Sequence, residues 1–160
     1  ETFTLSGWKG FALGDSGFLT ISAEYKDQER TNRDGYDFRQ QYPRLANGQF
    51  DPREATINRF NAWYGEPEIE QFTLFANAGG EISSDVRWYG WASLQDRTAK
   101  SAGFFRRAVD DRNVIQIYPD GFLPIIAPDV NDLSAAFGIN WAWGDWAMDS
   151  SLVWGRNDME

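Results

Sequence analysis

The chain contains no cysteine and no histidine. Without cysteine, this segment has no disulfide framework and no thiol chemistry. Without histidine, a haem-ligating imidazole would have to come from outside the segment. The formal net charge of -9 argues against a nucleic-acid-binding surface. No apolar run reaches the roughly 20 residues of a membrane-spanning helix, so we expect none.

The sequence also lacks the short motifs that carry most catalytic chemistry. It has no glycine-rich phosphate loop, no serine elbow and no EF-hand spacing. Asp110 and Asp111 could be imagined as a glycosidase pair, which needs two acids about 5 to 10 Å apart. Adjacent acids in a loop are far more often solvated charges. We therefore expect no enzyme activity, no catalytic residue, no metal site and no cofactor.

The connections between extended runs come in two unequal sizes. Short turns are indicated at 14–17, at 81–85 and at Gly144 and Asp145, where glycine, serine and aspartate cluster. Between them lie two connections, at about 28–67 and 96–131, in which the hydrophobic period vanishes. Such long loops are uncommon in compact soluble domains. Short turns on one rim and long loops on the other are typical of an outer-membrane β-barrel.

The extended runs alternate apolar and polar residues, as strands of a barrel wall must. We predict about six strands, at about 2–13, 18–27, 69–79, 86–95, 133–143 and 146–155. The predicted fold is all-β: an antiparallel up-and-down transmembrane β-barrel segment with short periplasmic turns and two long extracellular loops. The face assigned to lipid includes Leu19, Ile21, Phe72, Leu74, Phe137 and Ile139.

Three details of this alternation matter later. Lys9 falls on the parity of the apolar face of the first run, which a bulge at Gly7 or Gly10 could correct. Phe75 falls on the polar face. No acidic residue falls cleanly on the lipid face, whereas Glu24 and Asp149 point to the opposite one.

Six strands are too few to close a bacterial barrel, whose smallest members have about eight. We expect residues 1–160 to be part of one β-barrel domain that lacks its plug, because the chain begins mid-pattern with no signal peptide. The alternative is that the chain oligomerises.

The two long loops hold eleven of the fifteen basic residues, interleaved with aromatic residues. Arginine forks bind carboxylate and phosphate, and aromatic faces bind flat or sugar-like rings. The candidate ligand-binding residues are Arg39, Tyr42, Phe104, Phe105, Arg106, Arg107, Arg112 and Tyr118. The alternative is that these arginines pair with neighbouring Asp and Glu to order the loops, or contact lipopolysaccharide.

Several strings of residues resemble barrel segments of TonB-dependent outer-membrane receptors. One is Gly-Phe-Leu-Thr-Ile-Ser-Ala-Glu-Tyr at 17–25, followed by Thr-Asn-Arg at 31–33 and Gln-Tyr-Pro at 41–43. Another is Ser-Ala-Gly-Phe-Phe-Arg-Arg-Ala at 101–108, followed by Arg-Asn-Val at 112–114 and Ile-Tyr-Pro-Asp-Gly-Phe-Leu-Pro at 117–124. The resemblance extends over nearly the whole chain.

The resemblance implies a barrel of about 22 strands that captures a scarce nutrient, such as a ferric siderophore, at its extracellular loops. The implied location is the bacterial outer membrane. The implied partners are the nutrient, outer-membrane lipid and lipopolysaccharide, and TonB through the missing plug region. Two other functions stay open: a fragment of a passive porin, and a soluble carbohydrate-binding β-sheet module.

Overall fold

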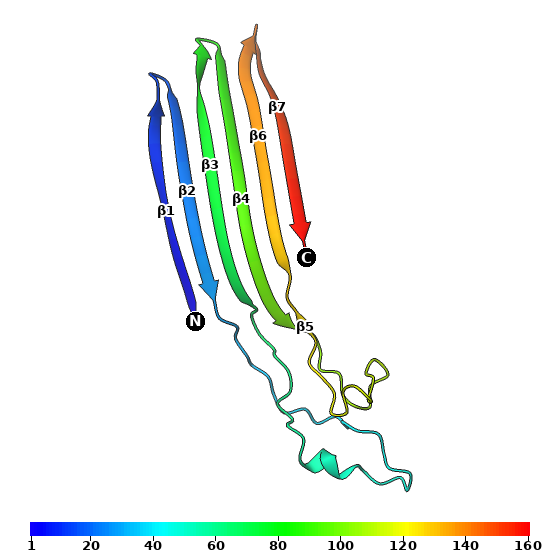
Figure 1. Cartoon of the computed structure of the whole chain (residues 1–160). Helices are drawn as coiled ribbons and strands as arrows, with labels where there is room; N and C mark the ends of the chain where they lie inside the picture. Colours follow the sequence, from blue (N-terminus) through cyan, green and yellow to red (C-terminus); the bar gives the residue numbers. More distant parts are fainter. The chain divides into compact units, whose positions relative to one another are not determined.

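The computed structural model describes all 160 residues, and almost all of its regular structure is β-sheet (Figure 1). The strands are β1 (Thr2–Leu13), β2 (Gly17–Gln28), β3 (Glu68–Ser83), β4 (Val86–Ala102), β5 (Ile125–Ile126), β6 (Asp129–Trp143) and β7 (Trp146–Met159). One short 3₁₀ helix, η1 (Pro52–Ala55), completes the list. The chain divides into two compact units. The sheet unit comprises 1–28, 69–98 and 128–160, and the loop unit comprises 29–68 and 99–127.

The strands form a single antiparallel sheet in the order β1-β2-β3-β4-β6-β7, with β5 paired to the end of β4. The all-β, up-and-down part of the prediction is therefore correct. The sheet is open, since β1 and β7 have no partner on their outer sides. There are seven strands rather than six, because Ile125 and Ile126 pair with Ala102 and Ser101. β3 and β4 also extend beyond the predicted ends at 79 and 95.

Tight turns join the strands at one rim of the sheet unit (Figure 1). Gly14 and Gly144 adopt φ of 61° and 59°, a conformation that glycine reaches without steric cost. Both long connections start and end at strand termini on the other rim, where β1 begins and β7 ends.

The bulge at Gly7 or Gly10 that could have corrected the parity of the first strand does not occur. The β1–β2 pairing runs without interruption from Thr2 opposite Gln28 to Leu13 opposite Gly17. Because side chains of directly opposed residues share a face, Lys9 lies on the same face as Ile21. The parity conflict seen in the sequence is therefore real, and the sheet accepts a lysine among apolar neighbours.

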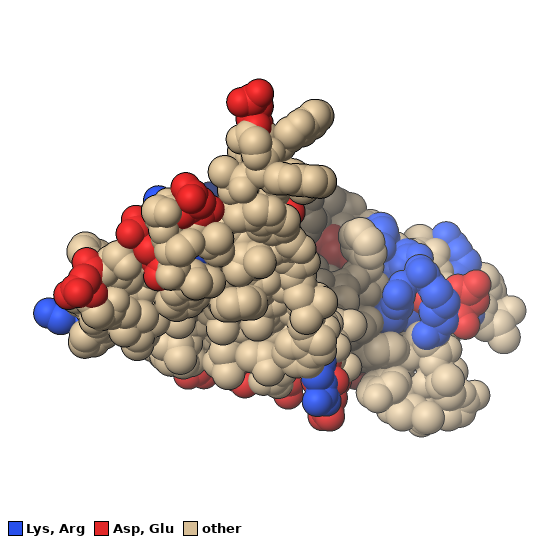
Figure 2. Space-filling model, turned by 90° about the horizontal axis from the view of Figure 1, so that it is seen from above, with Lys and Arg blue, Asp and Glu red and all other residues tan.

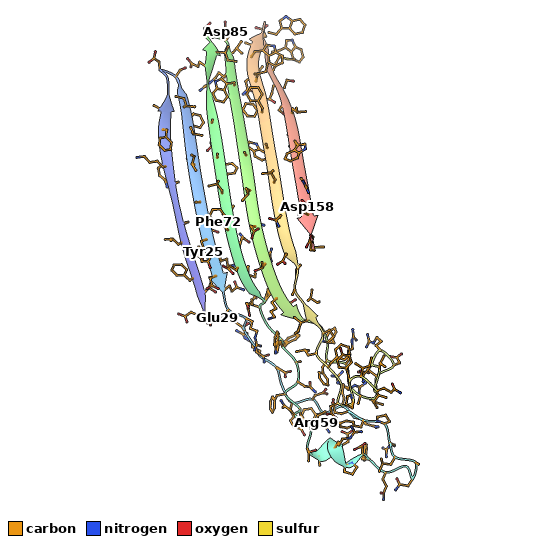
Figure 3. The ribbon with its side chains drawn as sticks, in the orientation of Figure 1. Tyr25, Glu29, Arg59, Phe72, Asp85 and Asp158 are labelled. Atoms are coloured by element: carbon orange, nitrogen blue, oxygen red, sulfur yellow. The ribbon has the colours of Figure 1, made fainter.

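The registers give the sheet one apolar and one polar face. Tyr25 and Phe72 are directly opposed on the apolar face (Figure 3). The same face carries Leu133, Ala135, Phe137, Ile139, Trp141 and Trp143 along β6. The faces continue across the middle of the sheet, because the rings of Phe75 and Trp91 on the polar face stack at 6.2 Å. Phe75, the residue that breaks the alternation, therefore has an aromatic partner.

Acidic side chains do share the parity of the apolar face, contrary to expectation. Asp96 and Asp158 are both on it, through their pairing with Asn131. They lie beyond the apolar stretch, toward the rim of the long connections, whereas Asp85 lies at the tight-turn rim (Figure 3). The apolar face is thus a band with a polar border.

The sheet unit has no hydrophobic core. The buried hydrophobic residues of the whole chain are Tyr42, Ile69, Ala108 and Ala136, of which Ile69 and Ala136 belong to the sheet unit. Phe137 is 57% exposed and Phe72 42% exposed. Viewed from the tight-turn rim, most of the near surface is uncharged and carries scattered charged groups (Figure 2). No second layer covers either face of the sheet.

Candidate functional site

The loop unit is organised around a turn that an Asp37–Arg39 pair holds closed. The Arg39 guanidinium donates from Nε to Asp37 Oδ1 at 2.8 Å and from Nη2 to Oδ2 at 2.7 Å. The backbone N–H of Arg39 also donates to Asp37 Oδ1. These hydrogen bonds from Arg39 hold the pKa of Asp37 well below its usual range. The Asp37 side chain is nearly buried, whereas that of Arg39 is 53% exposed.

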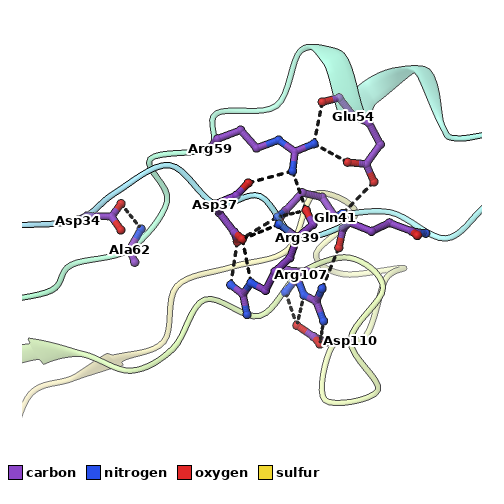
Figure 4. Close-up of polar contacts among 10 residues, drawn as sticks. Asp34, Asp37, Arg39, Gln41, Glu54, Arg59, Ala62, Arg107 and Asp110 are labelled. Carbon is purple, nitrogen blue, oxygen red and sulfur yellow. Dashed lines mark hydrogen bonds and ion pairs between the residues drawn. The ribbon is translucent and has the colours of Figure 1, made fainter.

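A second pair, Glu54 and Arg59, lies beside it at the 3₁₀ helix η1 (Figure 4). Arg59 Nη2 and Glu54 Oε2 are 2.6 Å apart, and Arg59 Nη1 donates to the carbonyl oxygens of Asp37 and Arg39. Burial alone would raise the pKa of Glu54. The N–H groups of Tyr42 and Gln41 and the Arg59 guanidinium outweigh burial, and the pKa is lowered.

Gln41 occupies the centre of this network and is fully buried. Its Nε2 donates to Asp37 Oδ2 and to the Arg39 carbonyl oxygen, both at 3.0 Å. Its backbone N–H donates to Glu54 Oε1 at 2.8 Å. The N–H groups of Gln41 fix the path of the chain, because each unmade bond would leave a desolvated donor, whereas the buried Oε1 has no hydrogen-bond partner.

The second long connection binds to the first through Arg107. Its Nη2 lies 2.9 Å from Asp110 Oδ1, and its Nη1 donates to the Gln40 carbonyl oxygen at 2.9 Å (Figure 4). Hydrogen bonding from Arg107 lowers the pKa of Asp110. The backbone N–H of Val109 donates to the Gln41 carbonyl oxygen, which adds a main-chain link. The two connections therefore form one folded unit.

Tyr42 supplies a second link between the connections. Its hydroxyl donates to Asp120 Oδ1 at 2.9 Å, and the Arg53 guanidinium lies 4.1 Å from the centre of its ring. Tyr42 is 2% exposed. Burial, reinforced by the hydrogen bond to Asp120, raises the pKa of Tyr42 to about 12. The phenol therefore stays neutral at physiological pH.

The structure divides the predicted ligand-binding residues into two groups. Arg39, Tyr42 and Arg107 belong to the network that orders the loop unit. Arg106 forms a β-bridge with Phe122 and has a buried Nη1 without a hydrogen-bond partner. The more accessible residues are Phe104, Arg112 and Tyr118, at 77%, 65% and 45% exposure. Phe105 is half-buried, and the position of Gly121 lies beside its ring.

A hollow of about 460 Å³ lies next to the network in the loop unit. It is lined by Phe38, Arg39, Gln40, Phe50, Glu54, Ala55 and Arg59. Of these residues, Arg39 alone belongs to the candidates that the sequence indicates. The interleaved arginine and aromatic residues indicate a binding surface in this connection. No spacing in the sequence predicts that residues 38–40 lie next to residues 50–59. The hydrogen bonds of Glu54 and Arg59 bring these segments together.

Comparisons with protein-family models, curated proteins and solved structures gave no match. The structure contains no helix with the length and apolar character needed to cross a membrane. No group of three or more carboxylates is arranged to hold a metal ion. The two features available for a functional argument are the exposed apolar face of the sheet unit and the ordered, arginine-rich loop unit.

Proposed function

We propose that this chain is part of the wall of a bacterial outer-membrane β-barrel, in a TonB-dependent receptor that takes up a scarce nutrient such as a ferric siderophore. The observation that carries the proposal is the apolar face of the sheet unit, which stays exposed along the whole meander. Soluble monomers rarely expose contiguous apolar patches larger than a few hundred Å². A bilayer supplies the apolar surroundings for this face.

The length of the apolar band supports a bilayer. On β6 it runs from Leu133 to Trp143, ten residue steps. At about 3.3 Å per residue this is roughly 33 Å along the strand, or about 25 Å across a membrane for a tilt of about 40°. That height matches the apolar band of outer-membrane barrels, about 25 Å. Asn131 and Asp129 follow beyond Leu133, where headgroups and water would begin.

The free edges of the sheet support a larger barrel. Backbone groups on the outer sides of β1 and β7 would be unsatisfied in lipid, where each costs several kcal/mol. β1 and β7 run in opposite directions. A further antiparallel strand can therefore pair with each edge and continue the up-and-down order. In this proposal the missing strands belong to the same receptor.

The loop unit favours a receptor over a passive porin. Its two connections are ordered by Arg39, Arg59 and Arg107, and they present aromatic side chains such as Phe38 and Phe104 to solvent. Capture of a scarce nutrient requires such a preorganised binding surface, whereas diffusion through a pore does not. The strings at 17–25 and 101–108 that resemble TonB-dependent receptors point the same way.

The soluble carbohydrate-binding module fits the structure less well. A soluble sheet buries at least one face against another layer, and neither face of this sheet is covered. Sugar binding would use one aromatic patch, whereas the exposed apolar residues here extend over strands β1 to β7. Retention in buffer without detergent, as a folded monomer, would favour this alternative.

Spin-label accessibility tests the membrane assignment, and no native cysteine within residues 1–160 competes for the label. Single cysteines replace Phe137 and Ile139 on the apolar face, and Ser134 and Asn140 on the polar face, in the intact outer-membrane protein. We expect labels at 137 and 139 to collide with oxygen dissolved in lipid. Labels at 134 and 140 should collide with a water-soluble nickel chelate or be shielded from both. Chelate access at 137 and 139 would contradict the proposal.

Energy dependence tests the receptor assignment separately. Uptake of ferric siderophore by iron-limited cells should stop when TonB is deleted, although binding to the cell surface persists. Uptake that continues without TonB would show a porin-type channel instead.

A further inference from the structure

The hollow in the loop unit is an open surface depression with the volume and the lining residues of a small-molecule site. Its volume of about 460 Å³ falls within the range of about 300 to 1,000 Å³ that ligand pockets occupy. Such pockets combine mostly apolar walls with a few polar groups that fix orientation. Here Phe38, Phe50 and Ala55 provide the apolar walls, and Arg39 and Gln40 provide polar groups.

The two phenylalanines are unusually accessible for residues of an ordered loop. Phe38 is 87% exposed and Phe50 55% exposed. Tyr36 supports the Phe38 ring, with ring centres 4.9 Å apart, and the Arg44 guanidinium lies 3.9 Å from the centre of the Phe50 ring. These contacts hold both rings in place while leaving ring surface open. An aromatic ligand could pack against that surface in offset or edge-to-face geometry.

The charge at the hollow suits a ligand with one negative group. Arg59 is neutralised by Glu54, and the pair is largely buried. Arg39 pairs with Asp37 through Nε and Nη2, but the arginine is 53% exposed and the aspartate 9%. The third nitrogen, Nη1, is the donor through which a carboxylate or phenolate can approach the guanidinium. A strongly anionic ligand gains less, because each arginine already has a carboxylate partner.

We propose that this hollow binds an aromatic ring bearing a carboxylate or phenolate, with the ring against Phe38 and Phe50 and the oxygen on Arg39. The inference rests on the proposed function, since it assigns the ligand class of the same receptor surface. Of the eight candidate ligand-binding residues that the sequence indicates, Arg39 alone lines this hollow. Gln40 stands beside Arg39, and its Nε2 is already used on the Tyr42 carbonyl oxygen.

Titration of the intact outer-membrane protein in detergent micelles with benzoate tests the inference. Cyclohexanecarboxylate serves as the non-aromatic control and benzyl alcohol as the uncharged control. We expect benzoate to shift the amide NMR signals of Phe38, Arg39, Gln40 and Ala55, with tighter binding than either control. Equal binding of benzoate and cyclohexanecarboxylate, or shifts confined to residues outside the hollow, would overturn the inference.

Variants separate the ring contacts from the ion pair. Phe38→Leu and Phe50→Leu keep apolar bulk, and each should weaken benzoate binding about three- to tenfold. Arg39→Lys should weaken benzoate more than benzyl alcohol, since lysine keeps the charge but loses the planar fork. Tyr64→Leu is the control: Tyr64 is 71% exposed in the same unit but does not line the hollow. Unchanged Gln41 and Val109 amide signals would show that each variant keeps the loop unit folded.

The outcome is independent of the membrane test. Benzoate binding is read from amide signals of the loop unit, and spin-label accessibility is read from positions in the sheet unit. Lipid exposure at 137 and 139 without benzoate binding would refute the ligand class alone. Benzoate binding without lipid exposure would refute the barrel assignment alone.

Discussion

At the scale of single residues, the arginines of the loop unit fall into a buried group and an exposed group. Arg59 and Arg107 are mostly buried and donate to backbone carbonyl oxygens as well as to carboxylates. Arg39 and Arg112 are more than half exposed. The planar guanidinium of arginine suits the buried positions, because one guanidinium donates to a carboxylate and to a carbonyl oxygen together. The pairing of arginine with neighbouring acids therefore explains much of the order in these connections.

Arg107→Ala should loosen the two connections from each other. It removes the guanidinium donors to Asp110 and to the Gln40 carbonyl oxygen and keeps the backbone N–H of residue 107 on Asp110, at a cost of about 1 to 2 kcal/mol once partial exposure is taken into account. Amide hydrogen exchange at Val109 should accelerate accordingly. Arg112→Ala is the matched control, because its contact to Asp111 is 3.9 Å long and exposed. Equal exchange in the two variants would show that Arg107 has no structural role.

Acid should destabilise the loop unit in a defined direction. The pKa values of Asp37, Glu54 and Asp110 are lowered in the folded chain, so their stabilisation is complete above the ordinary carboxyl range, near pH 4. It is lost as pH falls through the lowered values. NMR signals of Gln41 and Val109 during heating at pH 7 and pH 3 give the measurement. Asp37→Asn should show a smaller difference between the two pH values, and an unchanged difference would contradict this account.

The sequence contains the ingredients of the loop unit but not its geometry. Arg39 and Tyr42 can be singled out because arginine and aromatic residues concentrate there. Phe38 and Phe50 meet at one hollow only because Glu54 binds the backbone of Gln41 and Tyr42. Hydrogen bonds between residues more than ten positions apart leave no periodic trace in a sequence. That is why the hollow could not be predicted.

At the scale of the strand, alternation predicted the sheet well, because parity decides which face each side chain occupies. Alternation placed Lys9 on the apolar face, and the structure agrees. The bulge at Gly7 or Gly10 that would have moved Lys9 off this face is absent. Alternation ended β4 at about residue 95, although pairing continues to Thr98 opposite Asp129 and to Ala102 opposite Ile125. Those extra residues are mostly polar, and the two alanines among them do not give an apolar face, so hydrophobicity cannot mark them as strand.

One contact between strands depends on a missing side chain. A Cβ added at Gly138 would lie 2.4 Å from the Tyr89 ring, whose hydroxyl donates to Asp149 at 3.0 and 3.1 Å. Gly138→Ala should therefore displace Tyr89 and destabilise the sheet by about 1 to 3 kcal/mol. Gly155→Ala is the control, since its nearest neighbour would be at 3.8 Å.

Urea unfolding in detergent micelles measures this effect. Adding Tyr89→Ala to Gly138→Ala should produce less than the sum of the two single losses, because the clash disappears with the ring. Strictly additive losses would mean that Tyr89 does not pack over Gly138.

At the scale of the whole molecule, stability cannot come from a core, because only four hydrophobic residues are buried. The sheet unit must gain its stability from whatever covers its apolar face and from whatever pairs with β1 and β7. In our proposal, a bilayer covers the apolar face and further barrel strands pair with the two edges. The charged exceptions on the apolar face then become the most sensitive probes of the environment, since a charge costs little in water and much in lipid.

Substitution of Lys9 tests whether the apolar face contacts water or lipid. Lys9 lies opposite Ile21 on the apolar face, within a band whose neighbours include Phe11 and Leu5. Lysine on the lipid face of a barrel costs up to about 2 to 4 kcal/mol at the midplane and about 0 to 1 near the interface, and snorkelling reduces the cost. Lys9→Leu should therefore stabilise the intact protein in lipid vesicles, as measured by denaturant unfolding.

Lys26→Leu on the polar face provides the comparison, because Lys26 is opposed by Thr4 and Gln71. It should give no gain in the same vesicles, since that face borders the barrel interior in our proposal. If Lys9→Leu also fails to stabilise the protein, or destabilises it, the apolar face does not contact acyl chains, and the barrel proposal loses its main support.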